Sequence, residues 1–176
     1  IPTAAIPFTF SKMIVIACGT ISSLVGRLKK PQDLPIIDVL YPTALAASLA
    51  THNKRVGVIG TSTTIHSGSY RRVLAEIDPQ IQVFDRDCPL FVPLVESGFI
   101  EEDEPVTRLV AERYLGELRD AGVDTLIMGC THYPIISRII GSPLPEHDPH
   151  KDYPKNDRPH QPQSLPLLLS FFAESK

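Results

Sequence analysis

Apolar runs separated by polar stretches recur along the first 140 residues. The runs 13–17, 55–60 and 123–129 consist almost entirely of apolar and small residues. Continuous runs of this length are typical of strands buried on both faces of a parallel sheet. Shorter apolar runs at 35–39 and 81–84 predict two further strands. The chain is therefore expected to contain a buried sheet of short strands.

Helix patterns lie between these runs. The clearest is Pro105–Asp120, which has Pro near its start, apolar residues on roughly one stripe, and Gly122 just after its end. Three more helices are predicted at 22–30, 43–50 (with Pro42 in the first-turn position) and 68–77. Strands that alternate with helices predict an α/β fold with a parallel sheet flanked by helices and right-handed crossovers.

The pattern changes after Gly141. Seven prolines fall between Pro143 and Pro166, among His, Asp and Lys residues. Proline removes backbone donors and fixes φ, so this tail is expected to be extended or disordered. Its last part, 165–172, is apolar enough to dock on the body or on a partner.

Composition excludes several function classes. The 176 residues carry a formal net charge of −3 and no Trp, which gives no basic surface or stacking platform for nucleic acid. No apolar stretch reaches the roughly 18 residues of a membrane span, and the N-terminus does not read as a signal peptide. The absence of an initiator Met suggests that the chain begins inside a longer protein. Three cysteines without CxxC spacing argue against disulfides and structural zinc, so we expect a cytoplasmic protein.

Two cysteines occupy matching positions. Cys18 and Cys130 each follow an apolar run and one small residue, and each is followed by hydroxyl-bearing residues. Both thiols are then expected at the carboxyl ends of parallel strands, where open α/β folds bind ligands. Two thiols facing one pocket suggest an acid/base pair on opposite sides of a substrate. The alternative is that each is a small buried hydrophobic residue.

The neighbouring residues leave similar alternatives open. The Cys130 thiol is expected at a helix N-terminus, which would lower its pKa, and His132 either exchanges protons with it or has a capping or packing role. Glu96 is either a surface carboxylate or the partner of a cation in the site. Residues 61–64 resemble an anion-binding turn but are equally explained by helix capping. Cys88 is expected to be structural. No nucleotide-binding loop, pyridoxal lysine or metal-ligand spacing occurs, so neither a cofactor nor a metal is expected.

The segments around both cysteines resemble a known family. Gly129-Cys130-Thr131-His132-Tyr133-Pro134 is similar to the second-cysteine motif of the glutamate racemases, members of the cofactor-independent aspartate/glutamate racemase superfamily. Ala17-Cys18-Gly19-Thr20 resembles their first-cysteine motif, and segments 57–61 and 88–96 also resemble the family. The resemblance covers about residues 12–140. The chain departs from the family in having Gly19 where Asn is usual, and in lacking the N-terminal Asp-Ser-Gly motif and the Pro-Tyr-Gly segment.

The resemblance implies two similar α/β lobes with the substrate between them. Residues 1–38 would form part of the first lobe, with exposed apolar surface, 39–136 the second lobe, and 137–176 a return segment and the tail. Cys18 would act on D-glutamate and Cys130 on L-glutamate, with the thiols roughly 6–8 Å apart in a closed site. Glu96 and His132 would assist them, and Gly19, Thr20, Thr131 and His132 would contact the substrate.

The implied function is cofactor-independent racemisation of glutamate, which supplies D-glutamate for peptidoglycan and so for cell-wall biogenesis and cell shape. The expected partner is this small substrate, not nucleic acid or a membrane, and a homodimer is left open. Two alternatives stay open: a racemase for aspartate or a related amino acid, and a truncated or inactive homologue that acts as a binding module.

Overall fold

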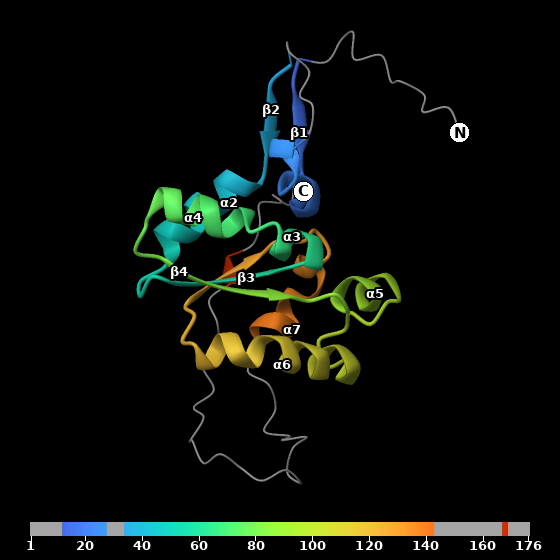
Figure 1. Ribbon diagram of the computed structural model, residues 1–176. Coiled ribbons are helices and arrows are strands. Elements are labelled where there is room, and N and C mark those ends of the chain that lie inside the picture. The colour runs from blue at the N-terminus through green and yellow to red at the C-terminus, as the bar shows by residue number, and fades with distance from the viewer. Residues whose placement is uncertain (1–11, 28–33, 143–166, 169–176) are drawn as a thin grey trace, which may run out of the picture.

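The computed structural model describes residues 12–27, 34–142 and 167–168 (Figure 1). Its strands are β1 (Ile14–Ile16), β2 (Ile36–Asp38), β3 (Arg55–Gly60), β4 (Gln82–Asp87), β5 (Thr125–Met128) and β6 (Leu167–Leu168). Its α-helices are α1 (Gly19–Ser22), α2 (Leu40–Ala50), α3 (Ser62–His66), α4 (Ser69–Ile77), α5 (Phe91–Glu96), α6 (Pro105–Asp120) and α7 (Ser137–Gly141). The 3₁₀ helices are η2 (Val25–Arg27) and η3 (Tyr133–Ile136). No helix within these ranges combines the length and apolar character needed to cross a membrane.

The strands form two parallel sheets. One has the order β4-β3-β5-β6 and the other pairs β1 with β2. Every pairing is parallel, and Ile59 of β3 lies opposite Met128 of β5. The predicted α/β class and all five predicted strands are confirmed. The two-residue strand β6 was not predicted, and the rest of the Pro-rich tail lies outside the described residues.

Helices cover both faces of the larger sheet (Figure 1). Val56 and Val58 of β3 pack among Ala44, Ala47 and Leu74, which come from α2 and α4. On the opposite face, Ile59 and neighbouring strand residues pack against α5, α6, η3 and α7. Successive residues of a strand point to opposite faces, so a continuous apolar run such as β3 fills both cores at once.

The β1–β2 pair stands apart from this three-layer body, on the side of α2 and α4 (Figure 1). The side chains of Val15, Met13 and Ile37 are 63%, 51% and 47% exposed. A helix or a second sheet packed on these strands would remove such side chains from water. Their exposure means that no such layer covers β1 and β2 among the described residues. The exposed apolar surface expected for residues 1–38 is therefore present on β1 and β2.

Two local predictions differ from the structure. The helix expected over 22–30 is replaced by α1, which ends at Ser22, and by η2; residues 28–30 lie outside the described ranges. Residues 62–64, expected in a turn, are already helical, because the Thr61 side chain accepts a hydrogen bond from the Thr64 amide and caps α3. A side-chain cap satisfies a helical donor that would otherwise have no partner.

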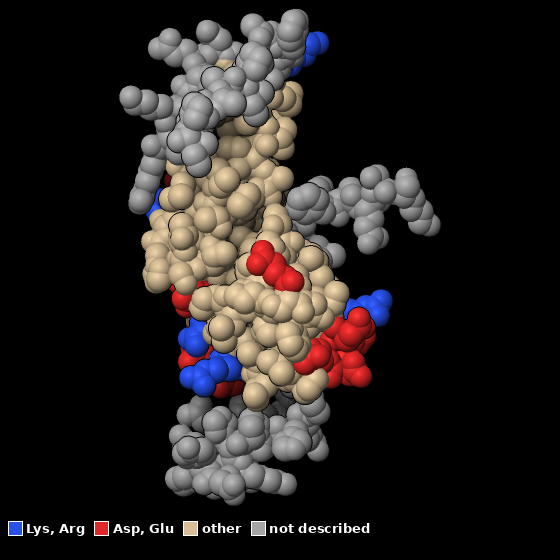
Figure 2. Space-filling model, turned by 90° about the vertical axis from the view of Figure 1, so that its right-hand side faces the viewer, with Lys and Arg blue, Asp and Glu red and all other residues tan. Residues whose placement is uncertain are grey.

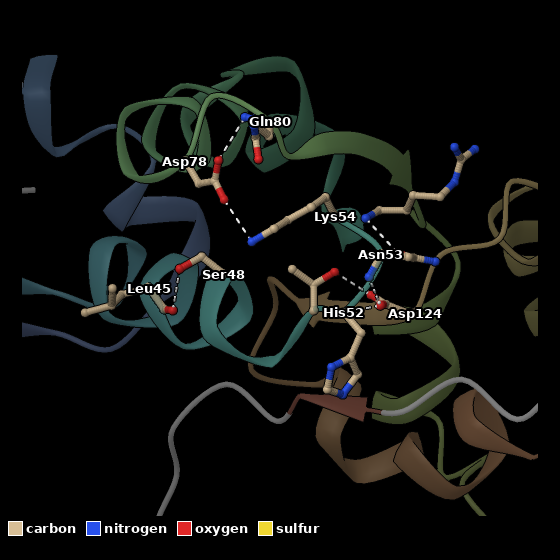
Figure 3. A network of polar contacts seen from close by, with 10 residues as sticks. Leu45, Ser48, His52, Asn53, Lys54, Asp78, Gln80 and Asp124 are labelled. Carbon is tan, nitrogen blue, oxygen red and sulfur yellow. Dashed lines mark hydrogen bonds and ion pairs between the residues drawn. The ribbon is translucent and has the colours of Figure 1, made fainter.

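A polar network joins the loops at the amino end of the larger sheet (Figure 3). The Asp124 carboxylate accepts hydrogen bonds from the Thr51 hydroxyl at 2.6 Å and from the His52 and Asn53 amides at 2.7 and 2.8 Å. Lys54, which has a left-handed φ of 63°, forms an ion pair of 2.9 Å with Asp78. These contacts connect the end of α2 to the starts of β3 and β5.

Candidate active site

Cys130 lies just beyond the carboxyl end of β5 and is 8% exposed. Gly129 precedes it and donates a backbone hydrogen bond of 2.7 Å to Ile59 at the end of β3. Tyr133, which begins η3, is fully buried and donates a hydrogen bond of 3.0 Å to the Cys88 carbonyl. The thiol is therefore attached on both sides to rigid, buried backbone.

The side chains of His132 and Glu96 connect this thiol to the protein surface. The Cys130 Sγ lies 3.8 Å from His132 Nδ1, and His132 Nε2 lies 3.3 Å from Glu96 Oε1. His132 occupies the N-cap position of η3 but makes no side-chain capping hydrogen bond. A tautomer that donates its Nε2–H to Glu96 leaves Nδ1 as an acceptor facing the thiol. The structure thus pairs the Glu96 carboxylate with His132.

Burial raises the pKa of the Cys130 thiol above its ordinary value. The backbone N–H of His132 acts in the opposite direction, and the nearby Cys18 raises the pKa further. The prediction that a helix N-terminus lowers this pKa is wrong in the free protein, because the cost of burying a charged sulfur exceeds the help from backbone donors. The raised pKa favours the protonated thiol of Cys130 over its thiolate.

Cys18 comes from the other sheet. It follows β1 and is the N-cap residue of α1, and its side chain is half-buried. Gly19, the next residue, lies in backbone contact with Gly129, which precedes Cys130. The structure therefore brings together two cysteines that the sequence separates by more than 100 positions.

Three threonine hydroxyls join the two parts of the chain beside Cys18. Thr20 Oγ1 lies 3.0 Å from Thr61 Oγ1 and 3.2 Å from Thr64 Oγ1, and the last two lie 3.0 Å apart. Helix capping accounts for Thr61, yet the contact with Thr20 was not predicted. The run of hydroxyl residues after β3 was the only available signal, because sequence spacing does not reveal a contact across about 40 positions.

The other site residues of the sequence interpretation are distributed around this centre. Gly19 is buried against Gly129, whereas the Thr131 side chain is exposed next to Cys130. Cys88 is fully buried in the core, which raises its pKa, in agreement with the predicted structural role. Among the described residues, no group of three or more His, Cys, Asp or Glu side chains could hold a metal ion.

An open hollow of about 630 Å³ lies on the neighbouring surface and is lined by Ile100, Glu101, Glu102, Asp103, Arg108, Ile135 and Arg138. Acidic side chains gather on the lower part of the face that Figure 2 turns toward the viewer. Arg138 forms a 3.5 Å ion pair with Glu102 in this hollow. Neither cysteine lines it, so it is separate from the candidate active site.

The fold and the site define an α/β protein with paired cysteines at the carboxyl ends of parallel strands. The sequence profile of the Asp/Glu/Hydantoin racemase family matches residues 11–146. The chain belongs to this family, as the resemblance of its cysteine segments predicted.

The relatives and solved structures that this chain resembles include proteins named glutamate racemase. The chain is 45% identical over 136 residues to a glutamate racemase of Geobacter metallireducens, an alignment that covers 77% of this chain and 50% of the relative. It is 48% identical over 131 residues to a glutamate racemase of Corynebacterium kroppenstedtii, covering 74% and 45%. The crystal structure of a Francisella tularensis glutamate racemase in complex with D-glutamate is similar with a TM-score of 0.66 and 37% identity, covering 74% of this chain and 48% of that one. The chain spans about half the length of the curated relatives it matches.

Proposed function

We propose that this chain interconverts L- and D-glutamate by a two-base proton transfer without a cofactor, with Cys18 and Cys130 as catalytic acid and base. The observation that carries the proposal is the backbone contact between Gly19, next to Cys18, and Gly129, next to Cys130, which brings cysteines that follow strands of two different sheets to one place. Inversion at one carbon requires a base on one face and an acid on the other, and two opposed thiols supply both.

The proton transfers follow from this arrangement. In the direction from L- to D-glutamate, the Cys130 thiolate removes the α-proton and the Cys18 thiol donates a proton to the opposite face. In the reverse direction their roles exchange. Each turnover leaves one sulfur protonated and the other ionised, so a proton must return through solvent or neighbouring groups before the next cycle.

His132 and Glu96 prepare the Cys130 thiolate. The raised pKa of Cys130 means that the free thiol must lose its proton before it can act as a base. His132 Nδ1, 3.8 Å from the sulfur, accepts that proton, and the Glu96 carboxylate stabilises the resulting imidazolium at 3.3 Å. Glu96 is exposed, so water screens its charge and its contribution is modest.

Hydroxyl and backbone donors bind the substrate. Glutamate has two carboxylates, and the hydroxyls of Thr20, Thr61 and Thr64, now bonded to one another, supply donors for one of them when the substrate enters. Thr131 and His132 lie beside Cys130 and contact the rest of the substrate. We assign Gly19 a contact through its backbone, because it has no side chain.

We further propose that the site lies between a second lobe, 39–136, and a first lobe of which residues 1–38 form a part, with 137–176 as a return segment and tail. The relatives are about twice as long as the matched region, which supports a first lobe larger than β1, α1 and β2. In the cell, the reaction would take place in the cytoplasm and supply D-glutamate for peptidoglycan. Growth of a D-glutamate-requiring bacterium without added D-glutamate, when it expresses this chain, tests that role.

Solvent-deuterium exchange tests the chemistry directly. Purified protein in D₂O is expected to introduce deuterium at the α-carbon of glutamate, while aspartate in a parallel reaction reports on substrate choice. Cys18→Ala and Cys130→Ala are expected to abolish racemisation, and Cys88→Ala, which removes a core thiol outside the site, is the matched control. Folded protein that introduces no deuterium would contradict the proposal and favour a binding module.

A further inference from the structure

Gly19 lies in backbone contact with Gly129. A Cβ atom added to Gly19 would lie 2.1 Å from the Gly129 carbonyl oxygen and 2.9 Å from its carbonyl carbon. Cβ atoms in real proteins essentially never lie closer than 3.0 Å to such a neighbour, so any side chain at position 19 requires a backbone shift of about 1 Å. In this chain, where Gly19 stands in place of the Asn that is usual in the family, the fit between α1 and the end of β5 leaves no room for a side chain at position 19.

Gly129 is not free to make that shift. Its amide donates a hydrogen bond of 2.7 Å to the Ile59 carbonyl, which continues the pairing of β5 with β3. A Cβ on Gly129 would itself lie 3.0 Å from the Ile59 oxygen and 3.2 Å from the Tyr70 ring. Gly129 is enclosed by the larger sheet and its helix layer. A displacement would therefore fall on α1, which lies between the thinly covered strands β1 and β2 in the chain.

Each glycine is bonded directly to a cysteine of the site, since Gly19 follows Cys18 and Gly129 precedes Cys130. We infer that the Gly19–Gly129 contact sets the separation of the two thiols, with Gly19 as a positioning residue. The functional part of this inference rests on the proposed racemisation. A shift of about 1 Å at Gly19 moves Cys18 relative to Cys130, and misplacement of this size costs about 100-fold in rate.

Other contacts also hold α1 on the body. Thr20 bonds the hydroxyls of Thr61 and Thr64, and the Ser69 hydroxyl donates to the Ser23 carbonyl at 2.9 Å. These contacts involve rotatable side chains that can follow a small movement. The glycine contact joins backbone to backbone, so it determines the distance of closest approach.

Cross-linking with dibromobimane measures the separation of the thiols without turnover. Each thiolate displaces one bromide and forms one thioether bond, so bridging two thiols releases two equivalents of HBr. Cys88 is fully buried with a raised pKa, and its failure to react reports that the protein is folded. The bridged peptides are identified by mass spectrometry.

Gly19→Ala is the test variant and Gly26→Ala is the matched control, because no atom lies within 4 Å of a Cβ added to Gly26. Gly26→Ala is expected to form the Cys18–Cys130 bridge at the wild-type rate. Gly19→Ala should form it at least about tenfold more slowly, with racemisation kcat reduced about 100-fold and KM changed only a few-fold. Equal bridging rates in Gly19→Ala and wild type would overturn the inference.

A second variant covers the case in which Gly19→Ala exposes Cys88 and is therefore unfolded. Thr20→Val removes the hydroxyl contacts and keeps the glycine contact, so bridging should stay within about threefold of wild type. A tenfold loss would assign the positioning to the hydroxyls and overturn the inference. If wild-type protein bridges rapidly but does not racemise glutamate, the proposed function fails while the positioning role stands.

Discussion

The two cysteines differ in how completely the surrounding residues are packed. Cys130 follows a strand of the four-stranded sheet, has buried residues on both sides, and contacts His132. Cys18 follows a strand of the two-stranded sheet, whose Val15 side chain is 63% exposed. One thiol is thus fixed by a complete core, and the other by a few contacts across to that core.

This difference shows which part of the site depends on which interactions. Burial around Cys130 fixes its position and raises its pKa. Cys18 owes its position to the contact of Gly19 with Gly129 and to the Thr20 hydroxyl bonds. The geometry of the site should therefore be more sensitive to changes around Cys18, and its acid/base chemistry to changes around Cys130.

The largest expected effect comes from removing either thiol. Cys18→Ala and Cys130→Ala should each reduce racemisation by at least about 100-fold, because a lost acid or base typically costs 10²–10⁴ in rate. Cys18→Ala should retain some deuterium exchange from L-glutamate, and Cys130→Ala some exchange from D-glutamate. Circular dichroism follows racemisation, and proton NMR follows exchange at the α-carbon. Identical residual exchange from both enantiomers in the two variants would contradict separate roles for the two thiols.

The next effect concerns the stability of the two sheets. Backbone amides of β3, which pairs on both sides, should exchange with solvent at least about 100-fold more slowly than those of β1 and β2. Two short strands with exposed apolar faces open locally at little cost. Hydrogen exchange measured by NMR checks this, and equal protection of the two sheets would show that the β1–β2 pair is as stable as the body.

A smaller effect is expected at the opposite end of the larger sheet. Asp124→Ala should lower the free energy of unfolding by about 2 kcal/mol, since three donors lose a charged acceptor that is partly open to solvent. Ser48→Ala, which removes an exposed hydroxyl bonded to the Leu45 carbonyl, is the control and should stay within about 0.5 kcal/mol. Urea titration measures both.

The same carboxylate predicts a pH dependence. Burial alone would raise the pKa of Asp124, but the hydrogen bonds from Thr51, Asn53 and His52 outweigh it and lower the pKa below its ordinary value. Because the pKa of Asp124 is lower in the folded than in the unfolded protein, its carboxylate stabilises the fold at pH values above the unfolded-state pKa of about 3.9. This stabilisation is lost as the pH falls through the folded-state pKa. Asp124→Asn should therefore reduce the loss of stability between about pH 5 and pH 2. An unchanged acid transition would contradict this assignment.

The smallest expected effect is at Glu96. Glu96→Gln should lower kcat by about tenfold or less, because the carboxylate is exposed and acts on Cys130 only through His132. The Glu96 charge would act on the reaction by stabilising the His132 imidazolium, and salt screens that interaction. Raising the salt concentration should therefore reduce the difference in kcat between Glu96→Gln and wild type. A loss as large as that of Cys130→Ala would place Glu96 in direct contact with the substrate.

Much of the fold was predictable because strong periodic patterns specify elements locally. The strand over 55–60 and the helix over 105–120 have the predicted bounds. The helix expected over 22–30 failed because local propensity did not reveal that α1 would begin at Gly19, against the end of β5. The pKa of Cys130 was predicted in the wrong direction because the degree of burial is a tertiary property.

The sequence alone determined the α/β class, the strands that precede Cys18 and Cys130, and the family, because these depend on residue types at short range. Only the tertiary structure decided that Gly19, next to Cys18, meets Gly129, next to Cys130. It also decided that Glu96 pairs with His132 and that Thr20 reaches Thr61 and Thr64. The physical reason is that such contacts are set by how layers pack across long stretches of chain, and sequence spacing carries no record of that distance.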